Sequence, residues 1–155
     1  MARDTLWKFF AGALASQRAS LLCYNRKHAT IQARSAAPRT NSVNPDGFDR
    51  GIQLFNDEAF FDAHEVWEDV WRETEGSEKK FLRGMIQVAV AFHHHATGNL
   101  AGARSVLERS RRTLAESPAH FAGINVRALL ASLEDWQKAL SSTRSTLPHP
   151  KIMKT

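Results

Sequence analysis

A histidine and a carboxylate stand four residues apart in the segment Ala63–Trp71, at His64 and Glu68. At 3.6 residues per helical turn, this spacing places both side chains on one face of a helix, with Trp71 one turn further along. An imidazole and a carboxylate in this arrangement can bind one metal ion, hold each other in a hydrogen bond that fixes helix packing, or take part in catalysis or substrate binding. The residues alone leave these three alternatives open.

A second set of candidates lies on the next helical stretch, where three consecutive histidines end a largely apolar run. Gln87 and His94 are seven residues apart and share one helix face. His93 lies on the helix face of Ile86 and Ala89. If this helix packs antiparallel on the preceding one, one of these two histidines, His93 or His94, can meet Glu68 or His64 and complete a site for a divalent metal, the one cofactor that these residues suggest. Gln87 can equally be a satisfied buried polar group, and His95 is expected to face solvent.

Apolar side chains recur at helical spacing in five stretches, so the sequence predicts an all-α fold, a compact bundle of four to five antiparallel helices. The helices are expected over about residues 47–55, 58–74, 78–95, 100–116 and 125–140. Asn56 is expected to cap the second helix, Gly76 to end it, and Ser77 to cap the third. Asn99 is placed to cap the fourth helix. No stretch alternates between apolar and polar residues for long enough to predict a strand.

Composition divides the chain into three parts. Residues 1–43 are a basic leader and linker, predicted to be disordered, residues 44–142 form the helical domain, and residues 143–155 form a C-terminal tail. The leader has three interpretations: an organellar transit peptide, a secretory signal, or, third, either a disordered extension or a start codon assigned too far upstream in a bacterial gene. We expect a cytoplasmic bacterial protein, or a protein of a plastid or another organelle if residues 1–43 are a transit peptide.

Charge and cysteine usage restrict the partners of the chain. The leader holds seven Lys or Arg against one acid, whereas residues 44–155 have a net charge of −1. This argues against nucleic acid as a partner, unless Arg104 through Arg112 form a continuous basic stripe. The only cysteine, Cys23, lies in the leader, so the domain offers neither a disulfide nor a thiolate metal site. No apolar run is long enough to predict a membrane span, and a homo-oligomer is one alternative among the undefined partners.

Four blocks of residues, in this order, resemble the DUF309 family, a group of small helical proteins of unknown function. The blocks are Phe55-Asn56, residues 60–72, residues 81–87, and Gly98-Asn99 with Gly102-Ala103. The resemblance covers about residues 48–115 and implies an all-α bundle, in agreement with the periodicity. It also implies that the polar signature positions include residues of one pocket, and they map here onto His64, Glu65, Glu68, Trp71, Gln87 and Asn99. It implies no particular reaction.

Two classes of function follow from these observations. In the first, a polar cluster between the second and third helices binds a small ligand or a divalent metal. Its candidate residues are His64, Glu65, Glu68, Trp71, Gln87, His94 and Asn99, with His64, Glu68 and His94 as the metal ligands. An enzyme of this class would use Glu68 or Glu65 as base and His64 or His94 as partner. In the second class, a non-enzymatic module, the cluster only fixes helix packing and the outer surface binds a protein.

Overall fold

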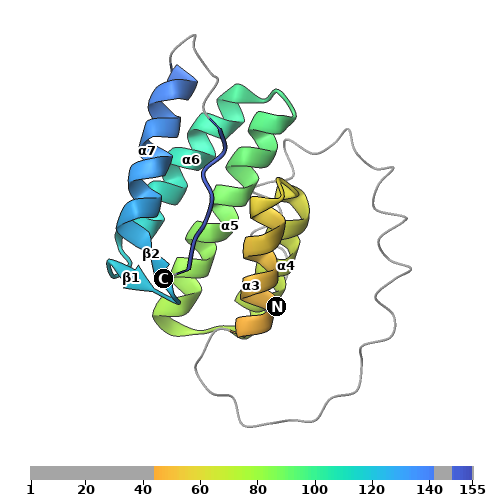
Figure 1. Cartoon of the computed structure of the whole chain (residues 1–155), viewed down its shortest axis with the longest axis vertical. Helices are drawn as coiled ribbons and strands as arrows, with labels where there is room; N and C mark the ends of the chain where they lie inside the picture. The colour runs from red at the N-terminus through yellow and green to blue at the C-terminus, as the bar shows by residue number, and fades with distance from the viewer. Residues whose placement is uncertain (1–43, 142–147, 155) are drawn as a thin grey trace, which may run out of the picture. The chain divides into compact units, whose positions relative to one another are not determined.

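In the part of the chain that the structure describes, consecutive helices pack against one another (Figure 1). The computed structural model describes residues 44–141 and 148–154. In chain order the elements are α3 (Pro45–Asn56), α4 (Phe60–Glu73), α5 (Gly76–Ala96), α6 (Leu100–Ala115), β1 (His120–Phe121), β2 (Ile124–Asn125) and α7 (Val126–Ser141). The predicted all-α class is confirmed, and the five helices of the described residues correspond to the five expected from the sequence.

Helix α5 is the central element of the core. Phe81, Met85 and Phe92 are buried almost completely, and buried residues occur on every side of this helix. Such a helix needs neighbours on more than one face, and α4 and α6 supply them. Gly84 lets α6 come close, because a Cβ atom at this position would lie 2.6 Å from Cδ2 of Leu114. The nearly continuous apolar run of the sequence therefore identified the buried helix correctly.

The connection between α3 and α4 differs from the prediction. Asn56 does not cap α4, because its side chain donates to the backbone oxygen of Ile152 (2.9 Å) and accepts from the backbone nitrogen of Ile152 (2.8 Å). Glu58 has a φ of 65°, a left-handed conformation that cannot continue into a helix. Helix α4 therefore begins only at Phe60, and the residue before it, Ala59, provides no side-chain cap.

The connection between α4 and α5 also differs from the prediction. Gly76 is the first residue of α5 and not the end of α4, and its φ of 69° makes the sharp entry into that helix. Helix α4 ends at Glu73, and the Thr74 hydroxyl donates to the Val70 carbonyl at 2.7 Å. Ser77 lies inside α5 and is not its cap.

A two-stranded hairpin, which the sequence does not predict, connects α6 to α7. Strands β1 and β2 pair antiparallel, and Ala122 and Gly123 form the turn with φ values of 51° and 76°. Positive φ at both turn residues is the requirement of a type I′ hairpin turn. The side chain of Asn125 then accepts a hydrogen bond from the backbone of Ala128 at 3.0 Å, which caps the start of α7. Strands of two residues are too short to produce a detectable alternation.

Candidate functional site

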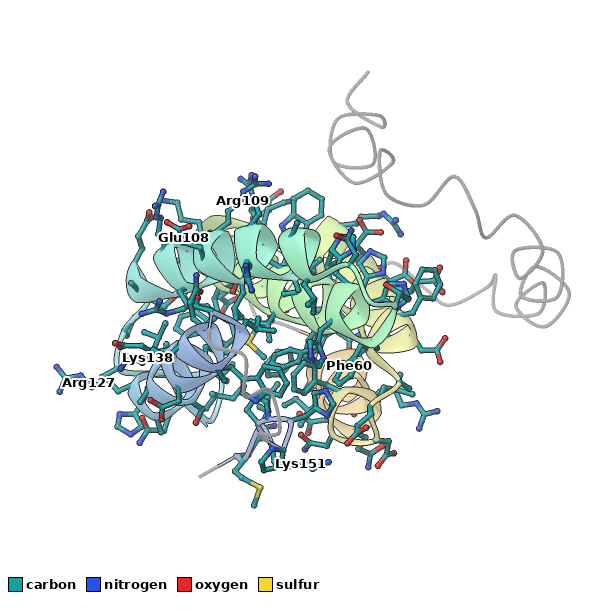
Figure 2. The ribbon with its side chains drawn as sticks, turned by 90° about the horizontal axis from the view of Figure 1, so that it is seen from above. Phe60, Glu108, Arg109, Arg127, Lys138 and Lys151 are labelled. Carbon is teal, nitrogen blue, oxygen red and sulfur yellow. The ribbon has the colours of Figure 1, made fainter. Side chains whose placement is uncertain are left out.

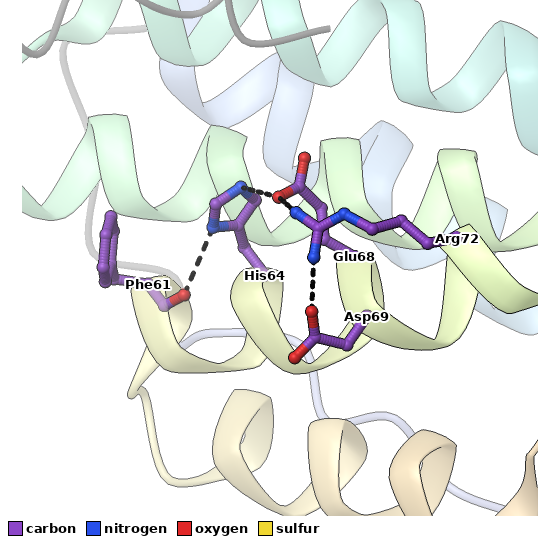
Figure 3. A network of polar contacts seen from close by, with 5 residues as sticks. All are labelled: Phe61, His64, Glu68, Asp69 and Arg72. Atoms are coloured by element: carbon purple, nitrogen blue, oxygen red, sulfur yellow. Dashed lines mark hydrogen bonds and ion pairs between the residues drawn. The ribbon is translucent and has the colours of Figure 1, made fainter. Parts of the chain in front are cut away.

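Four polar side chains lie in a row on α4, and we call His64, Glu68, Asp69 and Arg72 the α4 polar row (Figure 3). The Nδ1–H of His64 donates to the Phe61 carbonyl at 3.3 Å. Its Nε2 lies 3.9 Å from Oε2 of Glu68, which is too long for a hydrogen bond. The Arg72 guanidinium donates to Glu68 at 3.1 Å and to Asp69. The row is thus held together by contacts within one helix.

Exposure changes along the α4 polar row. The side chains of His64 and Glu68 are 14% and 23% exposed, whereas those of Arg72 and Asp69 are 60% and 71% exposed. Burial lowers the pKa of His64 below its ordinary value, although the Glu68 carboxylate acts in the opposite direction. His64 is therefore a neutral imidazole at neutral pH, with its Nε2 lone pair on the side of Glu68. The row is open to solvent at its Arg72 end and is not an enclosed cluster.

Helix α5 contributes His93 to the neighbourhood of the α4 polar row. The Phe61 ring lies against both histidines, with ring centroids 5.6 Å from His64 and 5.4 Å from His93. The pKa of His93 is lowered by burial and then by the nearby His94 and His64. The sequence left open whether His93 or His94 approaches α4 and named His94 as the metal-ligand candidate, and in the structure it is His93 that lies against the Phe61 ring.

His94 instead belongs to the connection between α5 and α6. The side-chain amide of Asn99 donates to Nδ1 of His94 at 3.3 Å, and its oxygen accepts from the backbone of Gly102 at 2.9 Å. Asn99 is thus the predicted cap of α6, and both its polar atoms are used within the fold. Among the residues that the structure describes, no three or more His, Cys, Asp or Glu side chains are grouped so that they could hold a metal ion.

The remaining candidates lie apart from one another. Gln87 is buried and turned toward α6, where its side-chain oxygen accepts a hydrogen bond from the Thr113 hydroxyl at 3.0 Å. Trp71 is half-buried, and Nζ of Lys79 lies 4.4 Å from its ring centroid, a cation–π contact. Glu65 is half-buried on α4. The candidate site residues therefore do not form one pocket. His64 and Glu68 belong to the α4 polar row, whereas Gln87 and Asn99 make separate hydrogen bonds that stabilise the fold.

Two histidines form a cluster that the sequence did not indicate. His95 was expected to face solvent, but its ring centroid lies 4.9 Å from that of Trp136 and 5.9 Å from that of His149. Burial, and then the neighbouring His149, lower the pKa of His95. His149 lies within residues 143–155, which the sequence predicts to be a C-terminal tail outside the helical domain. No local pattern marks it, since its partners are far away in the sequence.

The arginines of α6 do not form a free basic stripe. Arg104 donates to the Leu140 carbonyl, Arg111 pairs with Glu134 at 3.4 Å, and Arg112 pairs with Glu108. Figure 2 shows Arg109 projecting outward from α6 beside Glu108. The condition that would have favoured nucleic acid as a partner is therefore not met by these residues.

The DUF309 family model, described as a domain of unknown function, matches residues 48–106, as the sequence blocks indicated. An uncharacterised protein of Aquifex aeolicus (strain VF5) is 36% identical over 77 residues, which are 49% of this chain and 23% of that protein. The uncharacterised protein YpuF of Bacillus subtilis (strain 168) is 39% identical over 56 residues, 36% of this chain and 32% of its own length. The matched region thus spans less than a third of either relative. Within the described residues, no helix is long and apolar enough to cross a membrane.

Proposed function

We propose that the helical domain is a non-enzymatic protein-interaction module and that α4 presents its binding surface. The observation that supports this proposal is that the candidate residues fall into two groups, one bonded inside the fold and one open to solvent. Gln87, His94 and Asn99 make hydrogen bonds inside the fold, whereas the α4 polar row makes its polar contacts within one helix and opens to solvent. Two bacterial relatives support a cytoplasmic location for such a module.

The charge of α4 defines the chemistry of the partner. This helix has five Asp or Glu against a single arginine, Arg72, and three of those carboxylates, at Asp62, Asp69 and Glu73, are exposed. A partner with a Lys- or Arg-rich segment complements this surface, and such complementarity accelerates association and excludes acidic partners. Trp71 lies on the same helix, and Nζ of Lys79 covers its ring, so this cation–π contact is internal to the chain and the exposed carboxylates carry the complementarity.

Site-specific photo-cross-linking tests the proposal. A photoreactive phenylalanine analogue replaces Asp69 on α4 or, as matched control, Glu108 on α6, since both side chains are exposed and ion-paired within their own helices. Irradiation in a native extract should give an adduct with one basic protein from position 69, weaker at high salt, and none from position 108. Equal adduct patterns from the two positions would show that α4 is not a specific surface.

A divalent metal bound through His64 and Glu68 is the second candidate. The observation that favours it is the orientation of His64, whose Nδ1–H is fixed on the Phe61 carbonyl while its Nε2 lone pair lies on the side of a carboxylate. Backbone carbonyls commonly orient metal-binding histidines in this way. Equilibrium dialysis of the full chain against Zn²⁺, followed by elemental analysis, should then give a site that is lost in the His64→Ala, Glu68→Gln variant and kept in Glu108→Gln. Equal zinc content in the three proteins would reject this candidate.

A further inference from the structure

Two histidine rings with enclosed, unpaired nitrogens meet where the C-terminal segment, residues 148–154, contacts α5. The nitrogens are Nδ1 of His95, on α5, and Nε2 of His149, in the segment. Both atoms are buried, and within the described part of the chain neither has a hydrogen-bond partner. The two ring centroids are 5.9 Å apart. Unpaired buried polar atoms are rare in folded proteins, and a bound ion or water is a common explanation for them.

Aromatic side chains hold both imidazoles in place. The His149 ring stacks on Trp136 with 13° between the planes and 5.2 Å between the centroids. Its centroid also lies 5.1 Å from that of Phe60, which points inward among the helices (Figure 2), and 5.5 Å from that of Phe92. The His95 ring packs nearly perpendicular to the Trp136 indole, with centroids 4.9 Å apart. Packing therefore fixes the two rings before any ligand binds, as a site with few donors requires.

A carboxylate lies beside the other nitrogen of His149. Nδ1 of this ring is 3.3 Å from Oε1 of Glu58, in the connection between α3 and α4. The negative charge favours a proton on Nδ1 and so leaves the lone pair on Nε2, the enclosed nitrogen. Metal-binding histidines commonly have a carboxylate at one ring nitrogen and the metal at the other, and the carboxylate makes the imidazole a stronger ligand. His149 therefore has the surroundings of a metal ligand.

We propose that His95 and His149 bind one copper(I) ion through these two nitrogens. Among the described residues no cluster of three or more His, Cys, Asp or Glu could hold a metal, and structural zinc requires four ligands. Copper(I), a closed-shell univalent ion, is satisfied by two imidazoles in line, and imidazole is a suitable ligand for copper. A metal–nitrogen bond of about 2.0 Å to each ring, with about 1.1 Å from each nitrogen to its ring centroid, gives a centroid separation of about 6 Å. The rings are already at this spacing.

The ion would join two parts of the chain that are far apart in the sequence. The segment is otherwise held by Asn56, which makes two hydrogen bonds to the backbone of Ile152, and by the ion pair of Lys154 with Asp49. A metal shared by α5 and the segment adds a further link, so copper(I) should raise the midpoint of urea unfolding. The site does not involve the α4 polar row, so its test is independent of the proposed function.

Nuclear magnetic resonance of the imidazole nitrogens tests the proposal on the full chain. Cys23→Ser serves as the parent protein throughout, because the thiol at this position would itself bind copper(I). Equimolar copper(I), kept reduced by ascorbate, should shift the ¹⁵N resonances of His95 Nδ1 and His149 Nε2 and leave those of His64 unchanged. A shift at only one of the two rings, or at neither, would overturn the proposal.

Matched variants give the affinity, measured by competition with the copper(I) chelator bicinchoninate. His149→Phe keeps an aromatic ring in the cage and His95→Gln keeps a polar side chain, but each removes one ligand. Each should bind copper(I) about a hundredfold more weakly or worse, with the helical fold confirmed by circular dichroism. Glu58→Gln should weaken binding about tenfold, and His93→Gln, at another histidine of α5, should leave it unchanged. Equal affinities of His149→Phe and the parent would refute the site.

Discussion

Replacing Gly51 by alanine should destabilise the protein strongly, although alanine normally favours a helix. Gly51 is buried in α3, and a Cβ atom there would lie 2.1 Å from Nε1, 2.4 Å from Cδ1 and 2.6 Å from Cε2 of Trp67. Trp67 is fully buried, and its indole N–H donates to the Phe48 carbonyl at 3.1 Å. The ring cannot move aside without losing this hydrogen bond and its packing against Phe48 and Phe55.

The magnitude follows from three terms. The helix propensity of alanine contributes about 1 kcal/mol in favour of the variant. Overpacking costs about 1–3 kcal/mol, and the lost indole hydrogen bond leaves buried groups unpaired at about 1–3 kcal/mol. The Gly51→Ala variant should therefore lose roughly 3 kcal/mol of unfolding free energy, measured by urea unfolding and circular dichroism.

Gly84→Ala is the matched control for this experiment. Its Cβ would lie 2.6 Å from Cδ2 and 2.7 Å from Cγ of Leu114, a buried aliphatic side chain whose displacement breaks no hydrogen bond. The helix propensity gain of about 1 kcal/mol offsets about half of a packing cost of about 2 kcal/mol, so the net loss should be about 1 kcal/mol. A Gly51→Ala variant as stable as Gly84→Ala would refute the close contact between α3 and Trp67.

Three further predictions concern the polar groups. Thr113→Val should cost about 1–3 kcal/mol because it leaves the buried Gln87 oxygen unpaired, and Thr113→Ser should restore most of this loss in the same urea assay. Asn99→Ala should cost about 0.5–2 kcal/mol through the lost cap of α6, whereas Asn99→Asp should keep the cap and lose only the bond to His94. Because burial holds the pKa of His64 below its unfolded value of about 6.5, the unfolded state binds more protons, and stability should fall as the pH drops below about 6.5. His64→Gln should make that pH dependence shallower, and an unchanged slope would contradict the assigned burial.

The sequence was informative wherever one helix determined the outcome. The apolar run of α5 identified the central helix, and Asn99 was recognised as a cap because its partner is three residues away. The sequence did not predict contacts between segments that are far apart in the chain. Asn56 has the composition and position of a cap, but Ile152 takes its side chain, and nothing near Asn56 signals that partner. His149 was overlooked for the same reason.

At the candidate site too, the sequence predicted contacts within one helix but not contacts between helices. The i, i+4 spacing correctly placed His64 beside Glu68, but a carbonyl three residues earlier and the Arg72 guanidinium hold the two side chains, so they do not share a hydrogen bond. Which of three consecutive histidines approaches α4 depends on the rotation of α5 about its axis. A helix that is apolar on every side does not reveal that rotation, so the sequence could not choose between His93 and His94, and the structure places His93 beside α4.

The proposed function requires α4 to be an acidic surface for a basic partner. Its most direct test is the equilibrium affinity of the protein cross-linked from position 69 for the purified chain and for the Glu68→Gln, Asp69→Asn variant. Removing two carboxylates of the interface should weaken binding about tenfold or more and reduce its salt dependence, while the unfolding free energy changes by about 0.5 kcal/mol or less. Equal affinities for the two proteins at low salt would contradict the assignment of α4 as the binding surface.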